Sequence, residues 1–396
     1  MRNSRLLTAS LATCLALGLA ACGSSSGSSS SQPAEASSQG AGSPAAAEAS
    51  AGSTDAAAVD CLAESKATVD AALQEPALTV PSPAFDMSVN KGKKVWAINI
   101  LTNQFIETYS GYFEEAARAA GMEPTIFDGK GQVAEWNKGI EQAINQGADG
   151  IAIVGINLAS IGEKVQEARD AGIAVIDVLN SQPDAPLEYG LQGHVTSDYQ
   201  QSGATLAAWA LNDKQCDAGL GVLYTPDVAV WEDLQVGAVS EMNRLCPDCA
   251  AESEIINIAD IAVDSGRAAS TMLTKNPDIN VLFATGDSFV TFVEPAATQV
   301  RPDITIMGFD ALDANVESIA ADSGAQKASV GSPVIWESYA TIDQLGRAMA
   351  GLELTQGLVV PSRLIDKSNA VPGGNLAIFP AFEGTPEAFA ANWAGE

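Results

Sequence analysis

Residues 94–105 of the chain read KVWAINILTNQF and contain the transition that decides the fold. The first seven, Lys94 to Ile100, are largely apolar, as is typical of a strand that is covered on both faces. Apolar residues then recur at helical spacing as far as Gly121, a residue type that commonly ends helices: they are Ile106, Tyr109, Phe113, Ala116, Ala117 and Ala120. A buried strand followed at once by an amphipathic helix indicates an α/β protein.

The same alternation of strand and helix continues along the chain in two series. The first series adds strands at 125–127, 150–154 and 173–178, with helices at 133–146 and 158–171. The second has strands at 219–224, 254–258, 280–284 and 304–308, with helices at 231–245, 265–275 and 289–299. Two such series predict two lobes, each a doubly wound parallel sheet with helices on both faces. A ligand is expected in the cleft between the lobes, at the carboxyl ends of the strands.

The chain begins with the features of an export signal. Arg2 and Arg5 precede an apolar run that ends at Ala21 and is short for a bilayer-spanning helix, so residues 1–21 are predicted to be a signal peptide. Leu19-Ala20-Ala21-Cys22 resembles the bacterial lipobox, which implies cleavage before Cys22, a diacylglycerol on its sulfur and a lipoprotein that carries palmitate. The alternative is an ordinary secretory signal with an incidental cysteine.

A low-complexity segment follows Cys22. Residues 22–59 consist mainly of Ser, Ala and Gly and are expected to form a disordered tether, because this composition offers little to bury. Residues 60–92 are expected to be a poorly packed lead-in with a helix near 63–73. A lipid anchor and a tether together predict a folded domain held at a membrane surface.

Charge and motifs exclude several classes of function. The chain has 49 acidic and 20 basic residues, a net charge of −29, which disfavours nucleic acid and polybasic membrane contacts. With one histidine, His194, no set of metal ligands or catalytic triad is evident, so no metal, no cofactor and no enzymatic activity are expected, and His194 is interpreted as a structural or hinge residue. The stretch Gly129–Ala134 fits a dinucleotide pattern but follows the second strand, and we interpret it as a glycine-rich turn.

Four cysteines remain once Cys14 and Cys22 are set aside. They are Cys61, Cys216, Cys246 and Cys249, and an even number in an exported protein predicts disulfides. Cys246 and Cys249 have redox-type spacing but follow a helix instead of opening one, and a structural zinc would need a second ligand pair. Cys216 with Cys246 or Cys249 is the pairing we expect, with Cys61 in the other bridge; the sequence itself leaves the pairing open.

Several motifs between residues 93 and 365 resemble the type I, ribose-binding-like periplasmic solute-binding proteins. The matching segments follow in the family's order: Leu101–Phe105, Gly147–Ile151, Gly172–Ile176, His194–Asp198, Asn276–Asp287 and Gly308–Asp310. The resemblance implies a N-terminal lobe of 93–197 plus 333–360 and a C-terminal lobe of 198–332 plus 361–396. It also implies a three-segment hinge near Ser197–Asp198, Ser332–Pro333 and Pro361.

The resemblance also implies a set of ligand-binding residues, to which Trp231 is added as a candidate for stacking on a sugar ring. The set carried over is Asn103, Phe105, Ile106, Asn180, Asp287, Asp310 and Ser332. Alternatives stay open for three candidates: Asp287 as a helix cap, Phe105 as core and Trp231 in helix packing. Three departures from the family pattern make a sugar no more than the default ligand: the ring-binding arginine is absent, Gly286 replaces an asparagine, and Asn180 replaces an arginine.

The function implied is capture of a small polar, sugar-like ligand and its delivery to the permease of an ABC transporter. The protein is then expected to be a monomer, lipid-anchored on the extracytoplasmic face of the cell membrane. A sensor subunit that presents ligand to a membrane receptor is the alternative. An extracellular enzyme is disfavoured, because the sequence shows no set of base, nucleophile and metal ligands. A repressor of the same fold would need an N-terminal DNA-binding helix pair, whereas this chain begins with an export signal.

Overall fold

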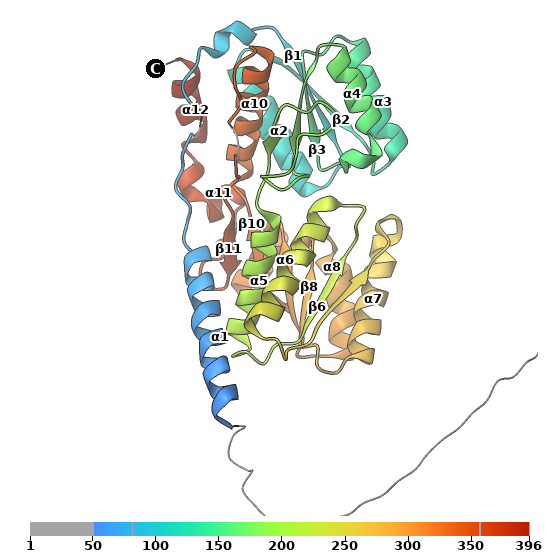
Figure 1. The fold of residues 1–396 in the computed structure, drawn as a ribbon, viewed down its shortest axis with the longest axis vertical. Helices are drawn as coiled ribbons and strands as arrows, with labels where there is room; N and C mark the ends of the chain where they lie inside the picture. Colours follow the sequence, from blue (N-terminus) through green and yellow to red (C-terminus); the bar gives the residue numbers. More distant parts are fainter. Residues whose placement is uncertain (1–50, 81, 356–357, 396) are drawn as a thin grey trace, which may run out of the picture. The chain divides into compact units, whose positions relative to one another are not determined.

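The computed structural model describes residues 51–80, 82–355 and 358–395. The expected signal peptide, the lipidation site Cys22 and the tether as far as residue 50 lie outside these ranges. Within them the chain forms the two expected α/β lobes, each with helices alternating with strands (Figure 1). This confirms the fold class.

The N-terminal lobe is built on a parallel sheet in the order β2-β1-β3-β4-β5. Its strands are β1 (Lys94–Asn99), β2 (Glu123–Asp128), β3 (Gly150–Val154), β4 (Ala174–Val178) and β5 (His194–Val195). The strand order reverses between β1 and β3, which is the switch point where open α/β sheets bind their ligands.

Helices cover both faces of this sheet and give it two separate cores. On one face α2 (Gln104–Ala119) packs against α10 (Val334–Met349). On the other face α3 (Val133–Asn145) packs against α4 (Gly162–Asp170). The short helical segment η2 (Leu158–Ser160) precedes α4, and the two together replace the single helix expected over 158–171. Burial on both faces explains why β3 and β4 are apolar along nearly their whole length.

The C-terminal lobe has a sheet in the order β11-β10-β9-β8-β6-β7, parallel except for the antiparallel pair β10 and β11. Its strands are β6 (Leu220–Tyr224), β7 (Ala251–Ile255), β8 (Val281–Ala284), β9 (Thr305–Phe309), β10 (Gln326–Gly331) and β11 (Arg363–Asp366). Strand β7 lies three residues before the segment 254–258 in which it was expected, because the strand itself is largely exposed and polar, whereas the apolar Ile256 and Ile258 follow its end.

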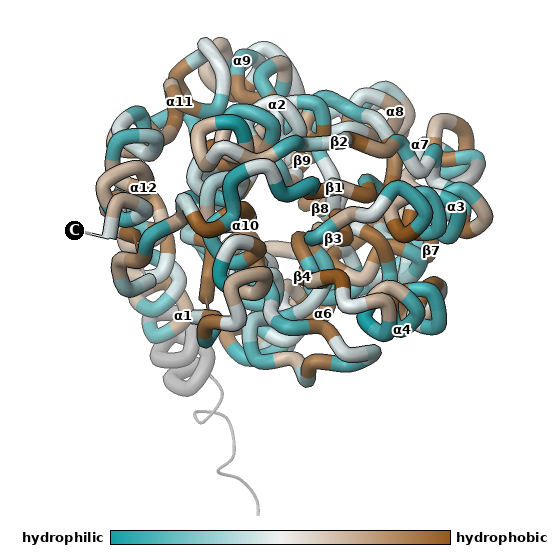
Figure 2. Tube along the Cα trace, turned by 90° about the horizontal axis from the view of Figure 1, so that it is seen from above, coloured by the Kyte–Doolittle hydropathy of each residue, from teal (hydrophilic) through white to brown (hydrophobic). Residues whose placement is uncertain are grey.

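Two layers of helices also enclose the second sheet. One face carries α5 (Tyr199–Asp213) and α6 (Ala229–Leu245), and the other carries α7 (Ile261–Lys275) and α8 (Asp287–Val300). The short segment η3 (Ile258–Asp260) precedes α7, and α9 (Asp313–Ala321) lies between β9 and β10. Figure 2 shows hydrophobic residues on central strands such as β1, β3 and β4, with helices of mixed hydropathy around them.

The lead-in is well packed, contrary to the expectation. Helix α1 (Ala51–Ala72) begins inside the expected tether, in an alanine-rich stretch that favours helix, and lies along α5. Val69 is 4% exposed in this contact. The chain then runs to η1 (Met87–Asn90) beside α10, where the Trp336 indole donates a 2.6 Å hydrogen bond to the carbonyl of Thr79. The lead-in therefore contacts both lobes.

The C-terminal segment also differs from the expected lobe boundary. The C-terminal lobe was expected to run to residue 396, but after β11 the chain returns to the N-terminal lobe through α11 (Asn375–Ile378), η4 (Pro380–Phe382) and α12 (Thr385–Trp393). Helix α12 packs on α10, with the Trp393 and Tyr339 rings stacked 5.8 Å apart. This apolar surface of α10 needs covering, and the aromatic residues of the C-terminal segment cover it.

The disulfide pairing corrects the expected one. Cys61 is bonded to Cys216, and Cys246 to Cys249. The packing of α1 on α5 brings Cys61 to the end of α5, close to Cys216. Cys216 therefore bonds to Cys61 and is not available to Cys246 or Cys249. That all four cysteines form disulfides is confirmed.

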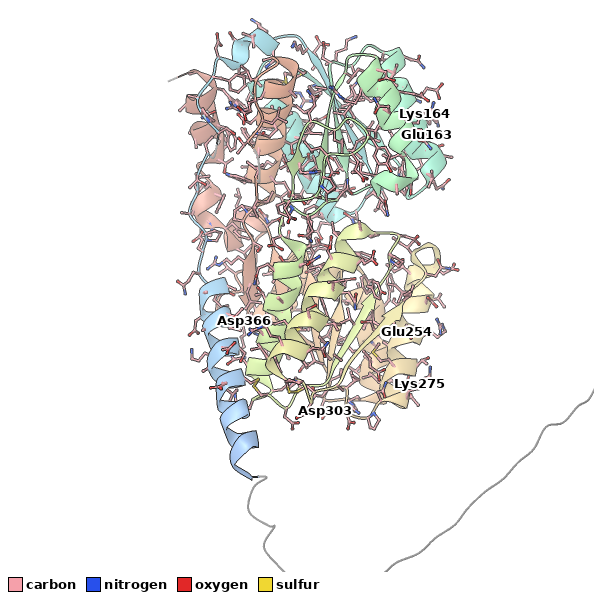
Figure 3. All side chains as sticks on the ribbon, in the orientation of Figure 1. Glu163, Lys164, Glu254, Lys275, Asp303 and Asp366 are labelled. Carbon is pink, nitrogen blue, oxygen red and sulfur yellow. A yellow bond between two sulfur atoms is a disulfide. The ribbon has the colours of Figure 1, made fainter. Side chains whose placement is uncertain are left out.

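The surface of the described part of the chain is charged. Figure 3 shows Glu163 and Lys164 on α4 and Asp303 ahead of β9 among the outward-facing side chains. Among residues 51–80, 82–355 and 358–395, no helix has the length and hydropathy needed to cross a membrane.

Candidate functional site

A cavity of about 330 Å³ lies between the lobes, where strands of both sheets end. The N-terminal lobe contributes residues that follow β1, β3 and β4, and the C-terminal lobe contributes residues that follow β6, β7, β8, β9 and β10. Six of the eight candidate ligand-binding residues line the cavity: Asn103, Phe105, Ile106, Trp231, Asp310 and Ser332. Asn180 and Asp287 do not.

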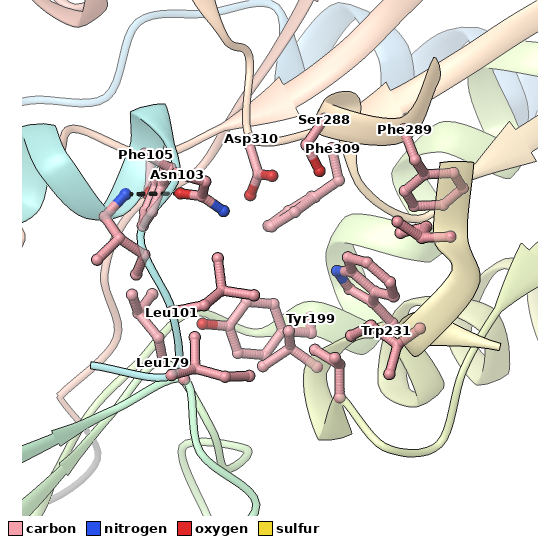
Figure 4. Close-up of a pocket in the computed structure, with 18 of the residues that line it drawn as sticks. Leu101, Asn103, Phe105, Leu179, Tyr199, Trp231, Ser288, Phe289, Phe309 and Asp310 are labelled. Atoms are coloured by element: carbon pink, nitrogen blue, oxygen red, sulfur yellow. Dashed lines mark hydrogen bonds between the residues drawn. The ribbon is translucent and has the colours of Figure 1, made fainter. Parts of the chain in front are cut away.

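Asn103 is held at the cavity by its place at the start of α2. As the N-cap residue, its side-chain Oδ1 accepts a 2.9 Å hydrogen bond from the backbone N–H of Ile106. This bond fixes the carboxamide, so that its NH2 group is turned toward the cavity and the Asp310 carboxylate (Figure 4). The cap therefore orients a hydrogen-bond donor for a ligand.

Asp310 sits in an unusual backbone conformation directly after β9. Its φ is 102° and that of Ala311 is 51°, both in the region that non-glycine residues rarely adopt. The Asp310 N–H donates to the carbonyl of Val330 (2.9 Å) and the Ala311 N–H donates to Oγ of Ser329 (3.1 Å), which holds the turn in place. Such strained conformations cluster at functional sites.

The carboxylate of Asp310 faces the cavity without a partner. In the part of the chain that the structure describes, it accepts no hydrogen bond. Burial raises the pKa of this carboxyl well above its usual range, and the charges of Asp287 and Glu337 raise it further. The group is therefore an acceptor in need of a donor or a positive charge.

Asp287 lies behind the cavity and supports the Asp310 turn. Its carboxylate accepts hydrogen bonds from the Leu312 N–H (3.1 Å), Ser329 Oγ (2.9 Å) and Gln326 Nε2 (2.7 Å). Burial raises its pKa to about 7 although these bonds act in the opposite direction. The N-cap of α8 is Gly286, with no side-chain cap bond, so the alternative role of Asp287 as a cap is also not observed.

Asn180 and His194 take part in a buried network inside the N-terminal lobe. Asn180 donates to Oδ1 of Asp177 (2.6 Å), and Nδ1 of His194 lies 3.0 Å from Oδ2 of the same carboxylate. Nε2 of His194 lies 3.1 Å from the carbonyl oxygen of Ala185. These contacts stabilise the end of β4 and agree with a structural role for His194.

The position of Trp231 explains one departure from the family pattern, the replacement of an asparagine by Gly286. It lies in the first turn of α6, with its ring centroid 5.1 Å from that of Phe289. A Cβ at Gly286 would lie 2.9 Å from Cζ2 of Trp231, so a larger residue at 286 and this tryptophan position exclude each other. The indole occupies the space that the usual asparagine would need.

Most of the apolar lining was not predicted from the sequence. The missed residues share positions just beyond strand ends or in first helical turns, apart from Phe292, one turn further along α8: Ile100, Leu101, Gly155, Leu179, Ser197, Tyr199, Val228, Val230, Ile258, Ile261, Ser288, Phe289, Phe292 and Phe309. That placement is the signal that points to them. Apolar residues there resemble ordinary core, and hydropathy does not distinguish the two.

The lining suits binding better than catalysis or metal coordination. Among the described residues, no lysine, arginine or histidine lines the cavity. Within the described ranges there is no group of three or more His, Cys, Asp or Glu side chains placed to hold a metal ion. What remains is one carboxylate, one carboxamide, a few hydroxyls and aromatic walls.

Two α/β lobes with a ligand-sized cavity between their strand ends define the class of two-lobed binding proteins. Residues 95–353 match the periplasmic binding protein domain family, and the chain belongs to this family. Membership in a family of binding proteins confirms the expectation of a protein that is not an enzyme.

Individual relatives are distant. The ribose import binding protein of Bacillus subtilis (strain 168) is 22% identical over 219 residues, 54% of this chain and 68% of that protein. A solute-binding protein of an ABC transporter from Mycobacterium smegmatis, with bound glycerol, is 22% identical at a TM-score of 0.61, covering 70% of this chain and 96% of that one. The fructose-binding periplasmic domain of a hybrid two-component system is 15% identical at a TM-score of 0.62, covering 70% and 92%.

Proposed function

We propose that this protein is an extracytoplasmic solute-binding protein that captures a small organic ligand between its lobes and delivers it to the permease of an ABC importer. The observation that carries the proposal is the cavity with lining from both lobes. A ligand that contacts both sides stabilises the closed form over the open one. Sugars and polyols are the first class to screen, because relatives are named for ribose import or hold glycerol.

The experiment is uptake in cells that lack the gene. Compounds that raise the melting temperature of the purified protein are radiolabelled and offered to wild-type and deletion cells. Loss of high-affinity uptake, restored by the wild-type gene, supports the importer role. Normal uptake together with a lost transcriptional response to the compound supports instead the sensor alternative, which one structural relative from a two-component system favours.

We further propose that the protein works as a monomer anchored through Cys22, since Leu19-Ala20-Ala21-Cys22 has the lipobox pattern. Cys22→Ala should move the protein from the membrane fraction to the soluble fraction or leave it unprocessed. Cys14→Ala is the matched control, because Cys14 is removed with the signal and its loss should leave the protein in the membrane fraction. Wild-type protein that is wholly soluble after fractionation would refute the anchor.

A further inference from the structure

We propose that the ligand of this cavity is a small organic cation, whose ammonium group pairs with Asp310 and whose apolar body lies among the aromatic rings. The inference rests on the proposed binding function and replaces the default sugar with a different class. It comes from the unpaired Asp310 carboxylate, the lack of a positive charge among the described residues that line the cavity, and the aromatic wall.

The first observation is the state of Asp310. Its carboxylate points into the cavity and accepts no hydrogen bond from the described residues, whereas Asp287 behind it accepts three. Closing the lobes over a ligand takes the Asp310 carboxylate further out of water. A buried carboxylate must then be paired or become protonated.

The second observation is that nothing positive lines the cavity. None of its lining residues is Lys, Arg or His, and two further acids act electrostatically on Asp310. These are Asp287 and Glu337, both fully buried. Neither oxygen of Glu337 has a hydrogen-bond partner. The missing positive charge is therefore one that the ligand can supply.

The third observation is the aromatic wall. Tyr199 and Phe309 meet edge to face with ring centroids 5.8 Å apart, and Trp231 stands against Phe289 (Figure 4). Aromatic faces attract ammonium groups, Trp most strongly, and a carboxylate beside such a wall is a common arrangement for binding organic cations. Apolar walls serve a hydroxyl-covered ligand poorly, because each hydroxyl that loses water there without a partner weakens binding.

The experiment compares cations with neutral molecules of the same shape. Three pairs are titrated calorimetrically into the purified protein near neutral pH: choline with 3,3-dimethylbutan-1-ol, acetylcholine with 3,3-dimethylbutyl acetate, and 2-phenylethylamine with 2-phenylethanol. Ribose and glycerol represent the neutral polyols. We expect at least one cation to bind tenfold or more tightly than its neutral partner.

Two variants separate the charge of Asp310 from other effects. Asp310→Asn keeps the shape and should remove the preference for the cation, whereas Asp313→Asn, an exposed acid at the start of α9, should keep it. Equal binding within each pair, or no cation binding at all, overturns the inference. Tight binding of ribose or glycerol alone also overturns it and leaves the proposed solute-binding function standing, while the uptake experiment decides that function independently.

Discussion

At the scale of single residues, Asp287 and Asp310 follow neighbouring strands of one sheet but meet different surroundings. Asp287 is fully buried and bonded to three donors, which include the backbone N–H of Leu312 beyond the Asp310 turn. Asp310 has no such partner and borders the cavity. One carboxylate therefore stabilises the fold, and the other is available to a ligand.

This contrast gives a prediction for the two aspartates. Asp287→Ala leaves buried donors without an acceptor and should lower the free energy of unfolding by about 2 kcal/mol or more. Asp310→Asn loses no hydrogen bond, and asparagine tolerates positive φ, so the empty protein should be at least as stable as the wild type. Urea unfolding without ligand measures both. An Asp310→Asn protein as destabilised as Asp287→Ala would contradict this division of roles.

Glu337 gives a prediction about pH. It is fully buried in α10, and burial raises its pKa from the ordinary 4.5 to about 8. Between these values the folded protein holds a proton that the unfolded chain has released, so stability should fall as the pH rises from about 4.5 to about 8. Glu337→Gln should reduce this fall and raise the melting temperature at alkaline pH, with little effect near pH 4.

The control for Glu337 is a glutamate on the surface of the protein. Glu317 on α9 is solvent-exposed, and Glu317→Gln should leave the pH dependence of melting unchanged. Calorimetric melts across the pH range, on wild type and both variants, provide the measurement. Equal slopes in wild type and Glu337→Gln would show that Glu337 does not titrate in this window.

At the scale of elements, uniformly apolar strands and helices with one apolar face could be predicted, and helices buried nearly all round could not. Strand β3 begins and ends where expected, and α3 differs by one residue at its end. Helix α10 was not predicted, and its sequence gives no sign that polar residues such as Glu337 and Asp343 are buried together with the apolar ones. The position expected for β7 was wrong because the strand is largely polar, and the apolar Ile256 and Ile258 that suggested a strand lie beyond its end. The resemblance and the added Trp231 supplied six residues that line the cavity and two that do not, while most of the apolar wall was not predicted.

The two disulfides offer a prediction about α1. The Cys61–Cys216 bridge joins residues 155 apart and ties α1 to the end of α5, while Cys246–Cys249 closes a separation of 3. On the chain-entropy model the first stabilises by about 5 kcal/mol and the second by about 2 kcal/mol. The double variant Cys61→Ser with Cys216→Ser should therefore melt well below Cys246→Ser with Cys249→Ser. Equal melting temperatures would mean that α1 adds little to the fold.

At the scale of the whole molecule, five segments pass between the lobes. Three are those expected for the hinge: the chain leaves β5 for α5, leaves β10 for α10, and returns from α10 to β11. Two more are the lead-in, from α1 to η1, and the segment from β11 to α12. Both extra segments contact α10.

Charge also acts on the whole molecule, since the chain carries 49 acidic and 20 basic residues. A net charge of −29 produces a field that attracts cations and raises their rate of association, in addition to any local contact at Asp310. Salt screens this long-range field, because the Debye length falls from about 30 Å at 0.01 M to about 3 Å at 1 M. Long-range steering should therefore appear in the association rate constant, and pairing with Asp310 in the dissociation rate constant.

The prediction is that salt and Asp310 affect the binding of the preferred cation at different steps. Between about 0.01 and about 1 M salt, stopped-flow measurement of its association rate constant should show a fall of about tenfold or more, with a smaller change in dissociation. Asp310→Asn should speed dissociation and leave the salt dependence of association in place, because one charge in so many barely alters the field. The neutral isostere should show no salt dependence. A salt effect confined to dissociation would contradict steering, since it would mean that Asp310 alone accounts for the preference for cations.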